Sequence, residues 1–412
     1  MKRGAPRGMR LHIGLFGRRN VGKSSLLNII TQQQVSIVSR MAGTTTDPVE
    51  KPMELLPLGP VLFIDTAGID DDSDLGSLRI EKTRRAMNRT DLGVIVTEGS
   101  CWGRFEERLL HEFQSREIPI VVVFNKIDRS QPPRELVARL TDEEIPTVST
   151  AAITGFGTLE LRQALLEATP DELVNRPGIL GEVVTAGDWV VLVVPIDKEA
   201  PKGRLILPQN QTIRDILDHE AQCIVVKENK LRSCLASLQT LPDLVITDSQ
   251  VFGQVARETP SSVKLTSFSI LFANWKGNLP EFVRGTLAID RLRPGDRVLI
   301  AEACTHHPIE DDIGRVKIPC WLNEHVGGDL VCEHVRGHDF PGDVGPFKLV
   351  IHCGACMFNR REVLTRMLQC RKFGVPITNY GLTIAHAHGI LARALTPFPS
   401  ALDILREADL CA

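Results

Sequence analysis

The stretch Gly17-Arg18-Arg19-Asn20-Val21-Gly22-Lys23-Ser24 fits the phosphate-binding pattern G-x-x-x-x-G-K-S/T. An apolar run over residues 11–16 precedes it and predicts a strand, and residues 25–30 follow it and predict a helix. In such a loop glycines let backbone N–H groups close around phosphate oxygens, while Lys23 reaches the β- and γ-phosphates and Ser24 holds Mg²⁺. The stretch predicts a nucleoside triphosphate site formed by residues 17–24 together with Ser25.

A second segment, Asp65-Thr66-Ala67-Gly68, follows the apolar residues 61–64. From the end of a strand Asp65 reaches Mg²⁺, and Gly68 offers its N–H to the γ-phosphate. This D-x-x-G pattern is typical of nucleotide-dependent switches.

Two more segments predict guanine specificity. Asn125-Lys126-Ile127-Asp128 follows the apolar residues 120–124, and the Asp128 carboxylate can accept paired hydrogen bonds from guanine N1–H and the 2-amino group. Adenine cannot satisfy that carboxylate. The loop that starts after a short strand at 147–148 resembles the GTPase loop whose backbone N–H contacts guanine O6; its residues are Ser149, Thr150, Ala151 and Ala152. GTP and GDP are therefore the expected ligands.

The region between these motifs resembles the first switch of the TrmE–Era–Der branch of GTPases, through Gly43-Thr44-Thr45-Thr46-Asp47. By that resemblance Thr45 is a Mg²⁺ ligand and Asn20 helps to hold K⁺, which supplies positive charge that other systems take from an arginine finger. A simple loop-capping role is the alternative for Asn20. Ile69 stands where Ras-like enzymes carry the water-orienting glutamine. We expect slow, K⁺-stimulated GTP hydrolysis with Lys23, Thr45 and Gly68 as catalytic residues.

Composition limits the class of protein. With 412 residues the chain is too long for one core, which predicts two or three domains. Lys and Arg total 48 against 51 Asp and Glu, a net charge of -3, so nucleic acid is not the expected partner. No run of about 18 apolar residues and no signal-peptide stretch occurs, so a soluble cytoplasmic protein without a membrane partner is expected. Ten cysteines in such a chain favour metal ligands or buried thiols over disulfides.

The order of apolar and amphipathic segments predicts three α/β domains. Residues 1–175 alternate strand-like and helix-like stretches, as in a doubly wound parallel sheet, and end in a region rich in Pro and Gly. Residues 176–262 predict a small α/β unit, with strands at 189–196, 223–226 and 244–247 and a helix at 211–219. A dimerisation role and a spacer role both fit its apolar strands. Residues 263–412 form the third predicted domain.

Metal-capable side chains gather in this last domain, where seven of the ten cysteines and eight of the eleven histidines lie beyond residue 300. Cys304-Thr305-His306 follows the strand-like residues 297–300, and His352-Cys353-Gly354-Ala355-Cys356 follows the strand-like residues 348–351. The two groups thus occupy equivalent strand ends, where parallel sheets form sites. A C-x-x-C turn with a third cysteine fits three corners of a 4Fe-4S cluster, and Cys₃His fits Zn²⁺ equally well.

The combination of these motifs resembles the HydF family, the GTPase scaffolds of FeFe-hydrogenase maturation. The resemblance rests on the phosphate loop, the switch over residues 43–49, the segment 65–71, and C-x-H followed after 45 residues by H-C-x-x-C. It implies a 4Fe-4S cluster on Cys304, Cys353 and Cys356, an α/β iron-sulfur cluster domain, and a homodimer formed through the middle domain. It also implies that the protein carries a diiron precursor to the hydrogenase apoprotein and meets the radical-SAM hydrogenase maturases.

The sequence leaves the fourth iron ligand open. His306 and His352 match the family signature, but a histidine beside a cysteine can instead orient the site through a hydrogen bond. His307, Glu310 and Asp311 are close enough in sequence to compete. His334 and His338 have i, i+4 spacing, yet Gly337 weakens the helix that this spacing requires, so we interpret them as surface or loop histidines.

A function from another class also fits the residues. The same GTPase motifs occur in RNA-modification and ribosome-assembly GTPases, in which a Cys₃His zinc domain would be structural. The acidic balance of the chain and the lack of a basic stripe count against that alternative.

Overall fold

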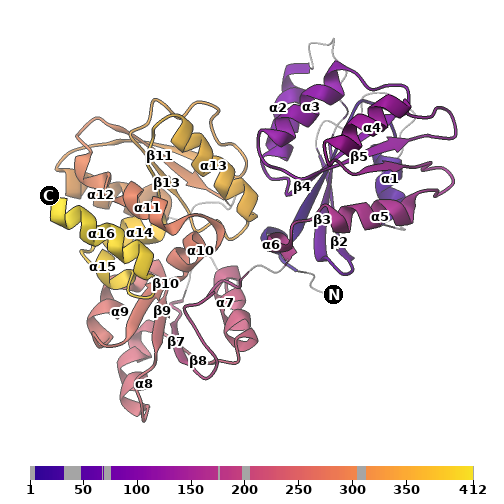
Figure 1. Cartoon of the computed structure of the whole chain (residues 1–412). Coiled ribbons are helices and arrows are strands. Elements are labelled where there is room, and N and C mark those ends of the chain that lie inside the picture. The colour runs from indigo at the N-terminus through magenta and orange to yellow at the C-terminus, as the bar shows by residue number, and fades with distance from the viewer. Residues whose placement is uncertain are drawn as a thin grey trace. The chain divides into compact units, whose positions relative to one another are not determined.

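The computed structural model describes residues 5–31, 48–66, 68, 76–174, 177–196, 205–303 and 312–411. Contacts within the chain divide it into two units, Met1–Arg176 and Pro177–Ala412 (Figure 1). Among the described residues, no helix has both the length and the apolar character needed to cross a lipid bilayer.

Unit 1 contains a six-stranded sheet in the order β2-β3-β1-β4-β5-β6. Every pair is parallel except β2 with β3. The predicted doubly wound sheet is confirmed, and the bounds of β1, β3, β5 and β6 agree with the four predicted apolar runs within two residues. The strands are β1 (Leu11–Phe16), β2 (Val49–Leu55), β3 (Gly59–Asp65), β4 (Leu92–Glu98), β5 (Ile120–Asn125) and β6 (Thr147–Ser149).

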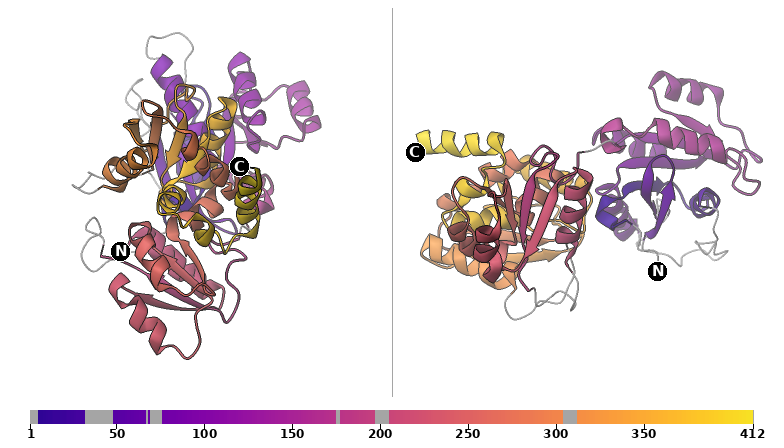
Figure 2. Two further views of the ribbon diagram at one scale, coloured as in Figure 1. Left: turned by 90° about the vertical axis from the view of Figure 1, so that its left-hand side faces the viewer. Right: turned by 90° about the horizontal axis from the view of Figure 1, so that it is seen from below.

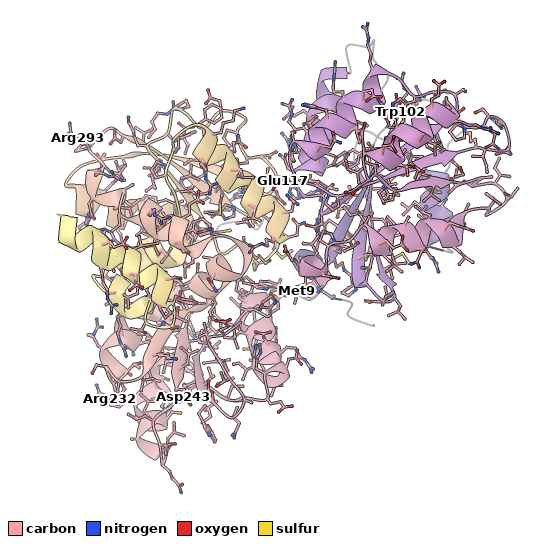
Figure 3. The ribbon with its side chains drawn as sticks, viewed as in Figure 1. Met9, Trp102, Glu117, Arg232, Asp243 and Arg293 are labelled. Carbon is pink, nitrogen blue, oxygen red and sulfur yellow. The ribbon has the colours of Figure 1, made fainter. Side chains whose placement is uncertain are left out.

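Helices cover both faces of this sheet, and each face has its own hydrophobic core. Leu27 and Leu165, from α1 and α5, belong to one core, while Met87, Phe113 and Leu140, from α2, α3 and α4, belong to the other. In the second core Trp102, labelled in Figure 3, packs against Phe124 with ring centroids 6.2 Å apart. The helices are α1 (Lys23–Ile30), α2 (Gly76–Met87), α3 (Arg104–Gln114), α4 (Arg134–Asp142), α5 (Thr158–Glu167) and α6 (Asp171–Val174).

The first half of unit 2 is a four-stranded parallel sheet in the order β10-β9-β7-β8. The β-branched run predicted as a strand over residues 189–196 ends at Val193, and the predicted helix begins four residues earlier than expected. The elements are β7 (Trp189–Val193), α7 (Leu207–Asp218), β8 (Gln222–Val226), α8 (Leu231–Ser237), β9 (Leu244–Thr247), α9 (Phe252–Glu258), β10 (Lys264–Ser267) and α10 (Phe268–Lys276).

The second half of unit 2 is another four-stranded parallel sheet, in the order β12-β11-β13-β14. Its strands are β11 (Arg297–Glu302), β12 (Val331–Arg336), β13 (Leu349–His352) and β14 (Ile377–Asn379). Its helices are α11 (Leu279–Thr286), α12 (Ile318–Val326), α13 (Arg360–Lys372), α14 (Tyr380–Ala387), α15 (Leu391–Ala394) and α16 (Pro399–Cys411), with the short turns η4 (Ile289–Arg291) and η5 (Ile313–Lys317).

One hydrophobic core joins the two halves of unit 2. It includes Val191 and Val245 of the first sheet, Val350 of the second, and Leu271 and Phe272 of α10. Figure 1 and the left view of Figure 2 show the two sheets at separate ends of the unit, and α10, labelled in Figure 1, lies between them. A division at residues 262 and 263 would separate β10 from the sheet that it completes, so the three-domain boundaries stay a prediction.

Gly285 of α11 lies against the backbone of β14. A Cβ atom at this position would lie 1.9 Å from the carbonyl oxygen of Ile377 and 2.5 Å from its carbonyl carbon. Because both are backbone atoms, the helix and the strand can approach this closely only when residue 285 has no side chain.

We expect Gly285→Ala to destabilise unit 2 by about 3 kcal/mol or more, since the added methyl group forces α11 away from β14. Alanine in place of an unhindered helical glycine would stabilise by about 1 kcal/mol, so the two effects have opposite signs. Thermal unfolding followed by circular dichroism is the measurement. Gly342→Ala is the control, since nothing lies within 4 Å of a Cβ there; equal melting temperatures for both variants would contradict the prediction.

Candidate functional site

The phosphate loop follows β1 and contains three residues with positive φ: Gly17 at 150°, Asn20 at 63° and Gly22 at 95°. A Cβ on Gly17 would lie 2.1 Å from the Val96 carbonyl oxygen, so the loop can turn over β4 only with glycine there. Gly22 precedes α1, whose first residues are Lys23, Ser24 and Ser25. The predicted loop thus joins a strand to a helix N-terminus, the arrangement that binds phosphate.

The buried side chain of Lys23 folds back onto the backbone of the phosphate loop. Its Nζ donates hydrogen bonds to the carbonyl oxygens of Gly17, at 2.9 Å, and Arg18, at 2.8 Å. In this position the ammonium group lies at the centre of the loop, where phosphate oxygens are expected.

Ser24 and Asp65 form the core of the predicted Mg²⁺ site. The Ser24 hydroxyl donates to Asp65 Oδ2 over 2.6 Å. Burial raises the pKa of the Asp65 carboxyl, although the bond from Ser24 and the charge of Lys23 act in the other direction. Asp65 Oδ1 is buried and has no hydrogen-bond partner among the described residues. A carboxylate oxygen left in this condition fits a divalent cation or its bound water, because buried acceptors otherwise find a donor.

The remaining switch residues are only partly described. Gly68 packs directly on the phosphate loop, because a Cβ there would lie 2.5 Å from Arg19 Cα. Thr66 donates its hydroxyl hydrogen to the Leu15 carbonyl over 2.7 Å. Thr45 and Ala67 lie outside the described residues.

Asn125 links the predicted base-binding loops to the phosphate loop. Its Nδ2 donates to the Val21 carbonyl over 2.8 Å, and its Oδ1 accepts bonds of 3.1 Å from the Thr150 hydroxyl and the Ala152 N–H. Lys126 donates to the Asn20 carbonyl over 2.5 Å and pairs with Glu98. The structure therefore brings three predicted segments together around the phosphate loop.

Of the groups predicted to contact guanine, the Asp128 carboxylate is exposed, whereas the backbone N–H groups of Ala151 and Ala152 already donate hydrogen bonds within the protein. Asp128 has an exposed carboxylate, 41% accessible, and its Oδ2 lies 4.0 Å from Arg129 Nε. The N–H of Ala151 donates to the Phe156 carbonyl over 3.2 Å, and the N–H of Ala152 is engaged by Asn125. Ser149 ends β6. The predicted contact from this loop to guanine O6 stays a prediction.

One loop contact was not predicted from the sequence. Glu106 of α3 is fully buried and accepts a two-point ion pair from Arg18, at 2.8 and 3.0 Å, and a bond from the Gly103 N–H. The pair ties the phosphate loop to α3. Its partners are 88 residues apart, and no local pattern marks such a pair.

The cysteine turn follows β13 directly. Cys353 Sγ accepts hydrogen bonds from the N–H groups of Ala303, at 3.0 Å, and Ala355, at 3.4 Å. Ala303 follows β11, the neighbour of β13 in the sheet, and is next in sequence to Cys304. The predicted convergence of two strand ends is therefore present up to Ala303, while Cys304 and His306 lie outside the described residues.

The thiols of this turn are protonated in the absence of a metal. Burial raises the pKa of Cys353 to about 11, and the neighbouring Cys356 adds to the shift. Burial also raises the pKa of Cys356, opposed by the charge of Lys276. Two backbone N–H groups aimed at Cys353 Sγ stabilise a thiolate, so the donor set fits a thiophilic metal or cluster that displaces the protons.

A buried lysine holds the turn. Lys276, at the end of α10 and 1% exposed, donates to the carbonyl oxygens of Ala355, Cys356 and Phe358, the first at 2.9 Å. Sequence reasoning missed it. The signal was a single charged residue, Lys276, at the end of the mostly apolar segment 268–276.

His352 is buried and held between two partners. Arg366 Nη1 lies 3.0 Å from its Nε2, and its Nδ1 lies 2.8 Å from the Cys353 carbonyl oxygen. Because a guanidinium only donates, Nε2 must accept and Nδ1 must carry the proton. Burial, reinforced by Arg366, lowers the pKa of His352 to about 3, so the ring is neutral.

Two further residues extend this network. Glu362 accepts from Arg366 over 3.4 Å and lies 2.7 Å from His338 Nδ1, and His338 stacks on Phe358 with ring centroids 5.3 Å apart. The interpretation of the nearby His334 as a loop residue is wrong, since it lies in β12 and is half-buried.

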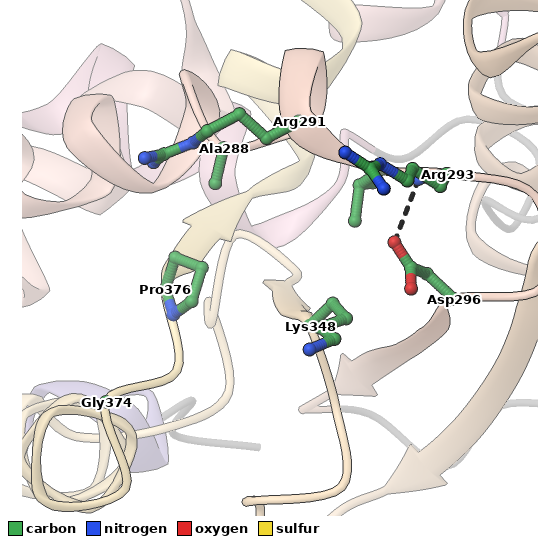
Figure 4. Close-up of a pocket in the computed structure, with 8 residues that line it drawn as sticks. Ala288, Arg291, Arg293, Asp296, Lys348, Gly374 and Pro376 are labelled. Carbon is green, nitrogen blue, oxygen red and sulfur yellow. Dashed lines mark hydrogen bonds between the residues drawn. The ribbon is translucent and has the colours of Figure 1, made fainter.

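A pocket of about 520 Å³ lies at the amino end of the second sheet of unit 2, lined by Arg291, Arg293 and Lys348 among others (Figure 4). Asp296 accepts a hydrogen bond from the Arg293 N–H over 2.8 Å. The cationic side chains point in different directions in Figure 4, so they do not converge on one anion.

The phosphate loop, the Mg²⁺-site aspartate Asp65 and the base-binding loop of Asn125 have the arrangement of a P-loop GTPase. Unit 1 is therefore a P-loop GTPase domain. A family model described as 50S ribosome-binding GTPase matches residues 12–126, which confirms the predicted enzyme class. Models described as the hydrogen maturase F dimerization domain and the hydrogen maturase F tetramerization domain match residues 179–277 and 280–397. The chain is a HydF-type GTPase.

The MnmE proteins described next match this chain in its GTPase domain only. The tRNA modification GTPase MnmE of Heliobacterium modesticaldum is 35% identical over 161 residues, which cover 37% of this chain and 32% of that protein. MnmE of Exiguobacterium sibiricum is 36% identical over 177 residues, covering 42% and 37%. The chain thus spans about a third of the length of these relatives.

Solved structures resemble the chain weakly. Era of Aquifex aeolicus bound to GDP and AlF4- is 23% identical, covers 52% of this chain and 92% of that chain, and has a TM-score of 0.34. The G domain of the Thermotoga maritima FeoB iron transporter is 24% identical, covers 39% and 99%, and has a TM-score of 0.32. At these scores neither likeness supports an argument.

We expect Lys276→Met to loosen the cysteine turn, because three carbonyl oxygens lose a buried donor at a cost of about 1–3 kcal/mol each. Alkylation of Cys353 and Cys356 by iodoacetamide, followed by mass spectrometry of the protein without metal, should become at least about 10-fold faster as the turn opens more often. Lys264→Met is the control, since Lys264 is exposed on β10. Equal alkylation rates in both variants would show that Lys276 does not hold the turn.

Proposed function

We propose that this protein is an FeFe-hydrogenase maturation GTPase, which binds a 4Fe-4S cluster and carries a diiron precursor to the hydrogenase apoprotein. The observation that carries the proposal is the combination, in one chain, of a GTPase domain, two hydrogen maturase F domains and a half-buried C-x-x-C turn beside the strand end that leads to Cys304. A structural zinc domain explains the turn, but not the two maturase domains.

The cluster is assigned to Cys304, Cys353 and Cys356. Three thiolates hold three irons of a 4Fe-4S cluster and leave one iron for an exchangeable ligand, which is the chemistry that a carrier needs. The N–H groups of Ala303 and Ala355 then stabilise sulfur charge, and Lys276 keeps the turn closed.

His352 acts in this proposal by positioning rather than by ligation. Its Nε2 is engaged by Arg366 and its Nδ1 by the Cys353 carbonyl, so neither nitrogen is free for iron without breaking a buried hydrogen bond. His306 remains the candidate for direct ligation among the two histidines.

The GTPase domain supplies the switch. Lys23 and the loop N–H groups hold the phosphates, Ser24, Thr45 and Asp65 hold Mg²⁺, and Asn20 holds K⁺. The Asn20 backbone has a positive φ, its carbonyl oxygen accepts a hydrogen bond from Lys126, and the residue is exposed at the loop. Coupling to unit 2 then consists of different affinities for partners in the GTP and GDP states.

The two hydrogen maturase F domains of unit 2 support self-association. We propose a homodimer through residues 179–277, and a higher assembly through residues 280–397 by the description of the matching model. The radical-SAM hydrogenase maturases and the hydrogenase apoprotein are the proposed partners, and the cytoplasm is the proposed location. The alternative of an RNA-modification GTPase with a zinc domain loses support because the MnmE relatives match the GTPase domain alone.

Anaerobic reconstitution with iron and sulfide tests this function. Wild type should show the EPR signal of a reduced 4Fe-4S cluster after dithionite, and Cys304→Ala, Cys353→Ala and Cys356→Ala should each lose it. Lys23→Ala should abolish GTP hydrolysis and keep the signal, because the two sites lie in separate units. His352→Gln should keep the iron content of wild type.

Three results would count against the proposal or a part of it. Tightly bound zinc without any iron signal in wild type would indicate a structural zinc domain. Loss of the cluster in Lys23→Ala would refute the separation of the two roles. Loss of one iron in His352→Gln would instead restore His352 as a ligand.

K⁺ is tested by hydrolysis in matched KCl and NaCl solutions. Wild type should hydrolyse GTP about 10-fold faster or more in K⁺, the order expected when a cation stabilises transition-state charge. Asn20→Gly should lose this ratio, since glycine tolerates the positive φ at residue 20 but lacks the amide oxygen. Equal rates in both salts for wild type would contradict the assignment of K⁺ to this site. An unchanged ratio of the KCl rate to the NaCl rate in Asn20→Gly would contradict the role of Asn20.

A further inference from the structure

Two histidines and one carboxylate converge on a single point of unit 2. Asp290 lies in η4, His325 in the last turn of α12, and His386 in the last turn of α14. Asp290 Oδ1 lies 2.8 Å from His325 Nε2 and 2.9 Å from His386 Nε2. All three ligand atoms lie within 4.8 Å of one another.

This trio lies on the edge of the sheet opposite to the cysteine turn. The turn follows the carboxyl end of β13. In contrast, η4 leads into β11, α12 leads into β12, and α14 runs back from the carboxyl end of β14. Because the four strands are parallel, the three positions fall toward the amino edge. The trio is therefore separate from the cluster residues.

A common hydrophobic core fixes the three backbones. Ile289 next to Asp290, Leu322 one turn before His325, and Ile384 two residues before His386 all belong to it, and each is at most 1% exposed. The ring centroids of the two histidines are 5.4 Å apart. Ligands on rigid, mutually packed elements bind metal with little reorganisation.

We propose that Asp290, His325 and His386 form a site for a divalent transition-metal ion of the Zn²⁺ class. Imidazole and carboxylate are the donors that such ions prefer, and three protein ligands leave positions for water. At metal–ligand distances of 2.0–2.1 Å, tetrahedral ligand atoms lie about 3.4 Å apart and octahedral neighbours about 3 Å apart. The two measured Nε2–Oδ1 separations already match the smaller value.

The exposure of the trio agrees with an open metal site. The side chains of Asp290, His325 and His386 are 49%, 37% and 16% accessible, so water can complete the coordination. A pair of exposed hydrogen bonds would contribute little to stability, which gives a purely structural role a small benefit. That role is nonetheless the direct competitor, because each Nε2–H can simply donate to Asp290.

Zinc binding is measured on the full chain with Cys304→Ser, Cys353→Ser and Cys356→Ser, so that the cysteine turn does not compete for metal. Calorimetric titration with ZnCl₂ should show one site that Asp290→Asn, His325→Gln and His386→Gln each weaken at least about 10-fold. Should the triple serine chain fail to fold, the same substitutions are compared in the iron-reconstituted wild-type chain, whose cysteines are then occupied.

His219→Gln is the matched control. His219 also lies near a carboxylate, with 3.9 Å between its Nδ1 and Asp215 Oδ2, but no second histidine joins that pair among the described residues. Zinc should raise the melting temperature of the control and of the parent chain equally, and not that of His386→Gln.

Cobalt identifies the ligands independently. The Co²⁺ complex should show visible d–d bands without the near-ultraviolet absorption of a cobalt–thiolate bond, and these bands should vanish in His386→Gln. Zinc affinity that is unchanged in all three variants, or the absence of a zinc-dependent shift in melting temperature in the parent chain, would overturn the site. In that case the trio is a hydrogen-bonded surface cluster only.

Discussion

Parallel strand pairing is the constraint on which both predicted sites depend. In unit 1 it places the ends of β1, β3, β5 and β6 on one edge, so that four segments spread over about 130 residues meet there. In unit 2 it brings the ends of β11 and β13 together, and with them the N–H of Ala303 and the sulfur of Cys353. Neither site would form if one of these strands ran in the opposite direction.

Buried charge stabilises both arrangements. Glu106 holds Arg18 of the phosphate loop, and Lys276 holds the carbonyl groups of the cysteine turn. In each case several hydrogen bonds within the protein replace the hydration of the charged side chain, and a charge can be buried only under that condition. The helix that ends at Lys276, α10, contributes Leu271 and Phe272 to the core that both sheets of unit 2 share.

Much of the fold and of the nucleotide site was predictable from local patterns. The apolar run before Gly17 predicted β1, and the run before Asn125 predicted β5, because buried parallel strands are continuously apolar. Lys23, Ser24 and Asp65 came from motifs whose spacing the chemistry itself dictates. The contacts of Glu106, Lys276, Arg366 and the Asp290 trio were not predictable, since their partners lie far away in the sequence.

The sequence by itself determined the class of this protein: a P-loop GTPase domain joined to domains of the HydF type, with thiols beside a strand end. It did so because motif and strand signals are local and appear as short runs of residues. Only the tertiary structure decided which nitrogen of His352 bears its proton, what holds the cysteine turn closed, and that Asp290, His325 and His386 meet. Those properties depend on burial and on distances between atoms, which packing of the whole chain sets.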